Sequence, residues 1–331
     1  MSSESPDGTG LKAYLGFEQV GDSPTDEKLT DMKRRKTMRR LFAFAGLVGG
    51  GVFFLVSLWA VGFSVTELVR QIPQFVEALE GYFPPTTYFG IPFIDVGQYW
   101  TFMNEANLFQ ASLVTVSIAF AGSVLGLPGA LFFGVMASER VVPYPLNFLF
   151  RGTMSFIRAI PALVWVLILI PLGGVTPFTA TLAIMIDTTG YLGRLFTDEL
   201  EEIADGTIEG IRSTGANKPQ IISFGMLSQV FRQFIAWIAF DLEHNVRVAI
   251  GLGLIGAGGL GLELDIQRKT FNYTEMMACI ILILLLAGSV ELLSQRVRSY
   301  LREDETVEQS GILEAFVDAP KKIVEATAGR R

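Results

Sequence analysis

The sequence predicts an all-α membrane protein with six membrane-spanning helices. Half of the 331 residues are hydrophobic and only 18% are charged, against about 25% in soluble domains. The mean hydropathy is +0.43. The hydrophobic residues also gather into long stretches, and a bilayer core of about 30 Å needs about 20 such residues in a helix.

The apolar stretches are expected to span the membrane over residues 41–63, 108–137, 143–171, 174–196, 229–261 and 276–293. The first stretch begins too late and is too long for a signal peptide. Pro161 should kink the third, because proline lacks the backbone donor and its ring clashes with the preceding turn. Gly46-x3-Gly50 and Gly122-x3-Gly126 are spaced for close helix packing.

Basic residues predict the orientation of these spans. They gather just before the first stretch and just after the last: Lys33, Arg34, Arg35, Lys36, Arg39, Arg40, Arg296, Arg298 and Arg302. Because positive residues stay on the cytoplasmic side, both termini should be cytoplasmic, in a cell (inner) membrane.

The same pattern divides the chain into segments. We expect a basic-ended tail (1–40), the first span (41–63), an extracytoplasmic loop (64–107), a core (108–296) and a C-terminal tail (297–331). The core contains the one long inner segment, 198–228. Apolar residues at helical spacing predict a short surface helix over 311–331.

Composition excludes several classes of function. The net charge of −7 argues against a nucleic-acid binder with a basic footprint. The chain has one cysteine (Cys279) and one histidine (His244), so it cannot form an internal disulfide or a multi-histidine metal site. These two residues also do not provide the nucleophile or metal cluster that a membrane enzyme would need. No GxxxxGK[ST] motif is present, so no cofactor is expected here, and any ATP and magnesium would bind another chain.

The inner segment has the pattern of two short helices. Apolar residues recur at helical spacing at Leu200, Ala204, Ile208 and Ile211. Gly215 should end the first helix, and Asn217 should cap a second with Pro219 in its first turn. The second helix would carry Ile222 and Phe224 on an apolar face. Such a unit is either an interfacial cap on the bundle or a docking surface for a cytoplasmic partner.

A glycine cluster, Gly256-Ala-Gly258-Gly259-Leu-Gly261, matches the GxGxxG spelling of dinucleotide sites. A true fingerprint needs a preceding strand and an acidic residue about 20 positions on. These glycines instead lie in a membrane stretch, which favours close backbone packing or local unwinding.

Charged residues inside the spans should face protein or water. Glu243 and Arg247 share one helix face, while Asp241 and Asn245 share roughly the opposite one. We favour Glu243–Arg247 as an internal pair stabilising the bundle; the alternative places Arg247 or Asn245 on a substrate path.

The third stretch carries two positive charges, Arg151 and Arg158, and Arg158 comes just before Pro161. It could neutralise Asp187 or Glu243, or bind a passing anion. His244, beside Glu243, is expected to be a hydrogen-bonded histidine rather than a proton switch.

Glu209-Gly-Ile-Arg-Ser-Thr-Gly215-Ala216 resembles the EAA loop of ABC importer permeases, with Gly210 and Ile211 in place of its two alanines. Three other segments are similar to the phosphonate branch: Arg158-Ala-Ile-Pro-Ala-Leu-Val-Trp-Val-Leu167, Phe83-Pro-Pro85, and Glu243-His-Asn-Val-Arg-Val248 running on into the glycine cluster.

The resemblance implies the type I permease fold and ATP-driven import of phosphonate or a related phosphorus oxyanion. It also implies a homodimer, two ATPase subunits and an extracytoplasmic binding protein. The inner segment would then hold the coupling helix, which fits a cleft of the ATPase. The residues expected to couple are Glu209, Gly215, Ala216, Asn217, Pro219, Ile222 and Phe224. The rivals are a permease for another solute, such as an amino acid, and an ion-coupled secondary transporter, which would show inverted repeats.

Overall fold

The computed structural model describes residues 24–88 and 91–301. The helix expected at 311–331 and most of the N-terminal tail therefore lie outside the described residues. The chain divides into two units, with the boundary after Phe75, and each is described by itself.

The first unit holds α2 (Pro24–Ala60) and most of α3 (Val65–Tyr82). The part of α2 from Arg35 to Ala60 is long and apolar enough to span a membrane. The helix thus begins well before residue 41 and continues through the basic segment. Within the described part of the first unit, no neighbour lies within 4 Å of a Cβ built on Gly46 or Gly50, so the packing role expected of these two glycines stays a prediction.

The second unit begins with structure that the sequence did not predict in the loop 64–107. Strands β1 (Pro85–Tyr88) and β2 (Ile91–Ile94) form an antiparallel hairpin in which Pro85 lies opposite Ile94. Helix α4 (Val96–Glu105) follows, and the Asp95 side chain caps it by accepting from the Gln98 backbone N–H. The Tyr99 hydroxyl donates to the Tyr82 carbonyl oxygen at 2.5 Å, which joins α4 to the end of α3.

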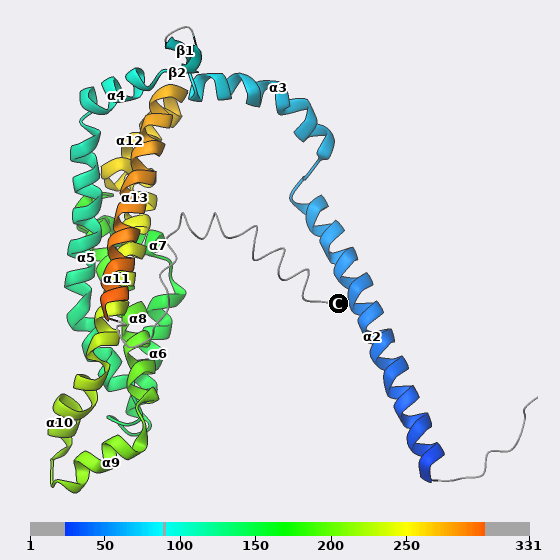
Figure 1. Cartoon of the computed structure of the whole chain (residues 1–331), viewed down its shortest axis with the longest axis vertical. Helices are drawn as coiled ribbons and strands as arrows, with labels where there is room; N and C mark the ends of the chain where they lie inside the picture. Colours follow the sequence, from blue (N-terminus) through cyan, green and yellow to red (C-terminus); the bar gives the residue numbers. More distant parts are fainter. Residues whose placement is uncertain (1–23, 89–90, 302–331) are drawn as a thin grey trace, which may run out of the picture. The chain divides into compact units, whose positions relative to one another are not determined.

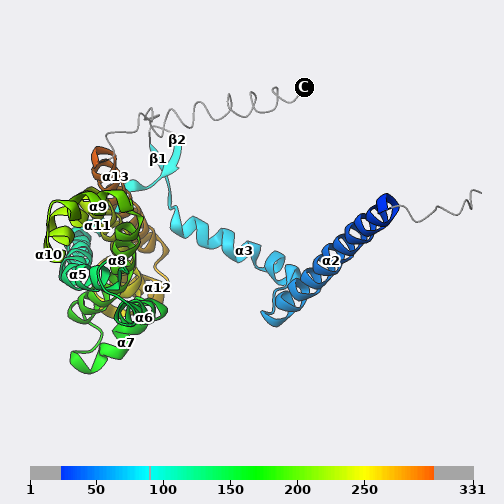
Figure 2. The ribbon, with the colours of Figure 1, turned by 90° about the horizontal axis from the view of Figure 1, so that it is seen from below.

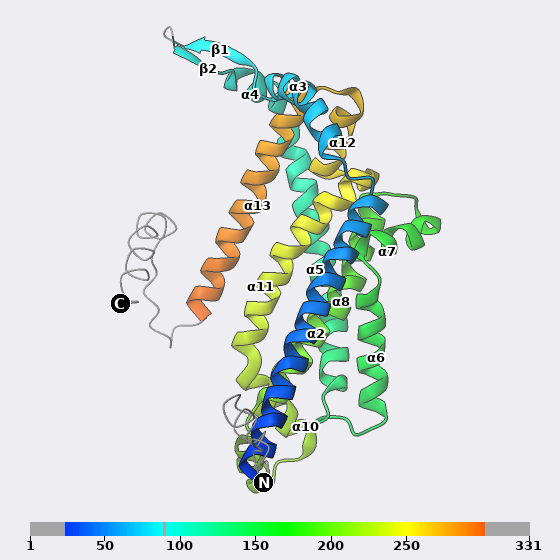
Figure 3. The same ribbon diagram turned by 90° about the vertical axis from the view of Figure 1, so that its right-hand side faces the viewer.

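The main body of the second unit is a helical bundle (Figures 1 and 3). Its helices are α5 (Leu108–Ala137), α6 (Leu146–Ala159), α7 (Ala162–Leu169), α8 (Pro177–Glu202), α11 (Leu227–Leu252), α12 (Gly259–Thr270) and α13 (Tyr273–Leu301). Seen along the bundle in Figure 2, α5, α8 and α11 lie together, with α6 and α7 to one side. Two short helices, α9 (Asp205–Ser213) and α10 (Lys218–Gln220), lie at one end of the bundle.

The predicted all-α membrane class is confirmed, whereas the count of six spans stays a prediction. Among the described residues four helices qualify as spans by length and composition: Arg35–Ala60, Leu108–Ala137, Lys218–Ala257 and Tyr273–Leu301. The broken pair α6–α7 makes a fifth if it is one span. The fourth expected stretch forms α8, which is 26 residues long but does not qualify; it carries Asp187 and Arg194 and is largely enclosed by its neighbours.

The kink predicted at Pro161 is confirmed and is large. Helix α6 ends at Ala159, α7 begins at Ala162, and the two axes differ by 88°. Proline at this point cannot donate to the preceding turn, so the chain leaves the helix and restarts it in a new direction.

Glycines allow α5 and α8 to pack closely along their length. A Cβ on Gly126 would lie 2.8 Å from the Met185 carbonyl oxygen, and one on Gly134 would lie 2.8 Å from that of Gly193. Both distances are shorter than real Cβ contacts, so only glycine fits. Small residues of this kind let membrane helices gain van der Waals contact.

Candidate functional site

Four polar side chains from three helices lie together on one face of the bundle. Arg158 is in the last turn of α6, Asp187 and Tyr191 are on α8, and His244 is on α11. The Arg158 guanidinium carbon is 5.9 Å from the Tyr191 ring centroid. The Tyr191 and His244 rings are stacked, with centroids 5.8 Å apart. We call this set the Arg158 face.

The sequence brings these groups together through helix periodicity and the proline break. Asp187 and Tyr191 are four residues apart and so share a side of α8. Arg158 lies in the last turn of α6, because the helix ends just before the break at Pro161. Asp187 interacts electrostatically with both Arg158 and His244. The Arg158 and His244 side chains remain exposed, so the face presents a cation, an imidazole and a phenol.

Glu243 belongs to a different network, in which it pairs with Arg247 and Arg298 rather than with Arg158. One carboxylate oxygen of Glu243 accepts from Arg247 at 2.9 Å, and the other accepts from Arg298 at 3.0 Å. Arg247 also donates to Glu291 on α13 at 3.1 Å. Sequence reasoning paired Glu243 with Arg247 but counted Arg298 only as a flanking charge. The length of α13, which continues to Leu301, brings Arg298 into this network.

Asn245 is enclosed in the bundle and does not line the Arg158 face. Its side chain has no exposed surface. Its amide nitrogen lies 2.8 Å from oxygen atoms of Ser123, Thr188 and Asp241. In this arrangement Asn245 lies inside the helix packing. Its place on a substrate path stays a prediction.

The glycine cluster breaks the helix that follows α11. The turn η3 (Gly253–Ala257) leads into α12, and Gly256, Gly258 and Gly259 have φ of 106°, 98° and 70°. Other residues rarely adopt such angles. A Cβ on Gly261 would overlap the Ile250 carbonyl oxygen. The cluster thus combines local unwinding with close backbone approach.

The inner segment forms two short helices around a glycine turn. The first expected helix is interrupted, since α8 ends at Glu202 and α9 begins at Asp205. Gly215 has φ +83°, and the Asn217 side chain accepts from the Gln220 N–H at 3.0 Å. Pro219 lies in the first turn of α10. A π-helical turn, η2 (Ile221–Met226), then joins α10 directly to α11.

The outer surface of the inner segment is suited to contact with another protein. Phe224 is 79% exposed, and Glu209 and Pro219 are also exposed. A pocket of about 440 Å³ opens beside them. It is lined by Arg140, Ile208, Arg212, Ala216, Lys218, Ile221, Ile222 and Met226.

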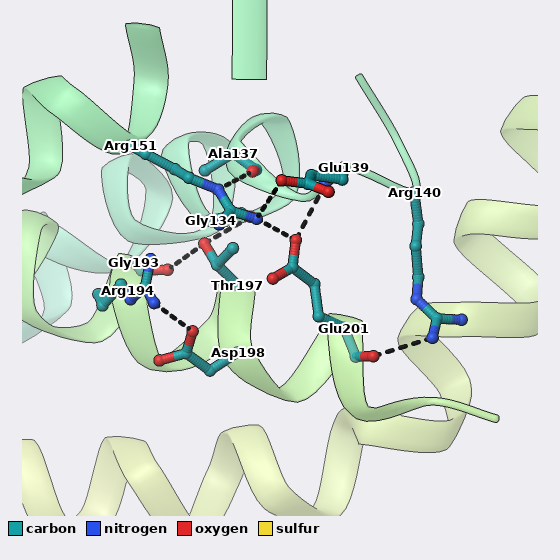
Figure 4. A network of polar contacts seen from close by, with 10 residues as sticks. All are labelled: Gly134, Ala137, Glu139, Arg140, Arg151, Gly193, Arg194, Thr197, Asp198 and Glu201. Carbon is teal, nitrogen blue, oxygen red and sulfur yellow. Dashed lines mark hydrogen bonds and ion pairs between the residues drawn. The ribbon is translucent and has the colours of Figure 1, made fainter. Parts of the chain in front are cut away.

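A polar network ties this segment to the bundle (Figure 4). Arg151 on α6 donates to the Ala137 carbonyl oxygen at 2.9 Å and pairs with Glu201 near the end of α8. Arg140 donates to the Glu201 carbonyl oxygen at 2.9 Å and pairs with Asp205 on α9 at 3.1 Å. The network therefore links α9 to the ends of α5, α6 and α8.

These features define a class: a helical membrane protein with a helix pair broken at Pro161, a polar face on the bundle and a two-helix segment around a glycine turn at one end. The family model described as "Binding-protein-dependent transport system inner membrane component" matches residues 126–301, more than half of the chain. The chain belongs to that family.

Individual relatives agree with this assignment. The chain is 25% identical over 248 residues to the phosphate-import permease protein PhnE of Mycolicibacterium smegmatis, an alignment covering 75% of this chain and 44% of the relative. It is 24% identical over 250 residues to the phosphite transport system permease protein PtxC of Stutzerimonas stutzeri, covering 75% and 86%.

A solved structure of the MetNI methionine ABC transporter, in inward-facing conformations, shares the fold. Its TM-score is 0.53 at 21% identity, covering 59% of this chain and 95% of that one. This supports the predicted type I permease fold.

Proposed function

We propose that the chain is the permease subunit of an ATP-driven importer that moves phosphonate or a related phosphorus oxyanion inward. The observation that carries this proposal is the Arg158 face. A charged side chain at the centre of a membrane helix costs about 2.5–3.5 kcal/mol on insertion scales. Exposed Arg158 and His244 should therefore face a second copy or a water-filled path rather than lipid.

The chemistry of the face suits an oxyanion of phosphorus. A guanidinium presents several N–H donors in a planar fork, which matches the oxygen atoms of phosphate-like groups. The Tyr191 hydroxyl and the His244 imidazole add neutral or cationic donors beside it. Asp187 limits the net positive charge, so the anion would be bound weakly enough to leave. The names of the phosphate and phosphite relatives support this substrate class.

The assembly would contain two copies of this chain, two ATPase subunits and an extracytoplasmic binding protein. ATP and magnesium would bind the ATPase subunits. Support comes from the family description, which names a binding protein, and from the exposed inner segment. Closure of the ATPase would move α9 and α10, and the Figure 4 network would pass the movement to the spans. Both termini would lie in the cytoplasm.

An amino-acid importer is the main alternative, because the solved structure of similar fold is described as a methionine ABC transporter. An amino acid brings an ammonium group as well as a carboxylate, and that group would favour a more acidic path. Competition assays separate the two: a phosphonate importer is inhibited by phosphonates and phosphite, and an amino-acid importer is not.

The test is reconstitution of the complete transporter in proteoliposomes with its ATPase and binding protein. We expect ATPase activity that rises with phosphonate-loaded binding protein, and uptake that stops when ATP is depleted. Arg158→Ala should lower uptake more than it lowers protein abundance. Arg70→Ala is the matched control, because Arg70 is exposed and pairs with Glu67 on its own helix. Uptake that persists without ATP would contradict the proposal.

A further inference from the structure

A second polar cluster lies behind the Arg158 face, inside the bundle. It joins Ser123 on α5, Thr188 on α8, and Asp241 and Asn245 on α11, each at most 3% exposed. One Asp241 oxygen, Oδ2, accepts from Thr188 at 3.1 Å and from Asn245 at 2.8 Å. We call this set the Asp241 cluster. It contacts neither a solvent surface nor the inner segment.

The charges around Asp241 do not neutralise it. Among the ion pairs of the described residues none includes Asp241, and the nearby arginines on α11 and α13 are engaged by Glu243 and Glu291. From α8, Asp187 and Tyr191 act on Asp241, and Asp187 adds a like charge.

Among the described residues, no positive side chain acts on Asp241 from the remaining elements. Helix α5 contributes only the Ser123 hydroxyl. On the Arg158 face, Arg158 and His244 act on Asp187 instead. A carboxylate buried in this way usually neutralises itself rather than staying charged.

The hydrogen bonds of the cluster leave buried acceptors without donors. The Asn245 amide has two N–H donors but lies 2.8 Å from three oxygen atoms, so it cannot satisfy all three. Asp241 Oδ1 and Asn245 Oδ1 are buried and have no hydrogen-bond partner among the described residues. A proton on the Asp241 carboxyl group removes the negative charge that would otherwise be buried at this unpartnered oxygen.

We propose that Asp241 binds a proton while α5, α8 and α11 are packed as described, and releases it when these helices separate. On release the O–H bond breaks, its electron pair stays on the carboxylate, and the proton passes to water admitted between the helices. The bound proton thereby locks the three helices together. Only the release step rests on the proposed importer cycle. An alkali cation is disfavoured, because the Asn245 amide nitrogen, which cannot bind a cation, lies 2.8 Å from the Ser123, Thr188 and Asp241 oxygen atoms.

The bound proton can be observed directly by infrared spectroscopy of the whole transporter complex in lipid. A protonated carboxyl group gives a C=O band separate from those of ionised carboxylates. We expect this band at neutral pH in the wild type, its loss in Asp241→Asn, and its retention in the control Glu105→Gln, which changes an exposed carboxylate on α4. Thr188→Val keeps the carboxyl but removes one donor, so it should shift the band. If neither Asp241→Asn nor Thr188→Val alters the band, the proposal is overturned.

Thermal unfolding of the same complex gives a second readout. Raising the pH should remove the proton and lower the Tm of the wild type. The Tm of Asp241→Asn should not fall over the same increase in pH, because an amide resembles the neutral acid and cannot ionise. The Tm is also measured in sodium buffer and in choline buffer. If sodium changes the Tm of the wild type but not that of Asp241→Asn, the cluster binds a cation and the proposal is overturned. These readouts need no substrate, so failure of uptake with an intact band would count against the proposed function instead.

Discussion

Gly215 forms the turn of the inner segment, and the hinge role that we propose for it gives the sharpest mechanical prediction. Its φ of +83° lies in the left-handed region, which costs a residue with a Cβ about 1–2 kcal/mol. No atom lies within 4 Å of a Cβ built there, so Gly215→Ala adds backbone strain and no clash. A strain of 1–2 kcal/mol changes the population of the hinged conformation by a factor of about 5–30.

The assay is ATP-driven uptake by the reconstituted transporter, normalised to the amount of inserted protein. We expect Gly215→Ala to lower uptake by roughly the 5–30-fold that the backbone strain implies. Gly215→Trp should abolish uptake while the chain still inserts, since its side chain has open space within this chain and would obstruct only the ATPase.

The matched control is Gly210→Ala in α9. Gly210 has no atom within 4 Å of a built Cβ and no positive φ. Alanine is favoured over glycine within a helix by about 1 kcal/mol, so this variant should retain uptake. Normal uptake by both Gly215 variants would refute the hinge, and equal loss in Gly215→Ala and Gly210→Ala would show that any added methyl group is harmful there.

Three further predictions concern stability. Gly126→Leu should lower the Tm of the purified complex, because overpacking costs about 1–3 kcal/mol or more. Gly152→Leu should not lower it, because no atom lies within 4 Å of a Cβ built on Gly152. Equal Tm values for the two variants would contradict the α5–α8 packing. Glu243→Gln should lower the free energy of unfolding by up to about 3 kcal/mol, the low end for breaking a buried ion pair. The loss is small because Arg247 is 47% exposed and keeps its pair with Glu291. An unchanged midpoint of chemical denaturation would refute this. Hydrogen bonds from Lys269 and Arg268 lower the pKa of Asp265 below its usual 3.8. The Asp265 carboxylate therefore stabilises the fold above pH 3.8, and this contribution is lost as the pH falls through the lower folded-state pKa. An acid titration of the Tm should show this loss in the wild type and not in Asp265→Asn.

Much of the fold could be predicted because it follows from local patterns. Apolar length marks the spans, and the proline at 161 marks the break between α6 and α7. Asn217 and Pro219 mark the start of α10, and a glycine at 215 marks the turn before it. Each of these features is set by residues within a few positions of one another, so the sequence displays it.

The β1–β2 hairpin and the side-chain clusters could not be predicted in the same way. Strands β1 and β2 are only four residues each and carry no clear alternating pattern. The Arg158 face and the Asp241 cluster depend on the rotation of α8 relative to α11. Periodicity correctly separates Glu243 from Asp241 on α11, but it does not say that Tyr191 and His244 stack or that Arg298 reaches Glu243. Such contacts come from tertiary packing.

The central claim is that the inner segment receives the movement of a separate ATPase. A single cysteine at Phe224, the exposed tip of η2, tests it by cross-linking in the assembled transporter, because the one native cysteine is buried. The account predicts a cross-link from Phe224→Cys to the ATPase subunit whose yield changes with ATP, and none from Glu105→Cys at the other end of the bundle. Absence of any cross-link at Phe224 in a complex that still imports substrate would contradict it.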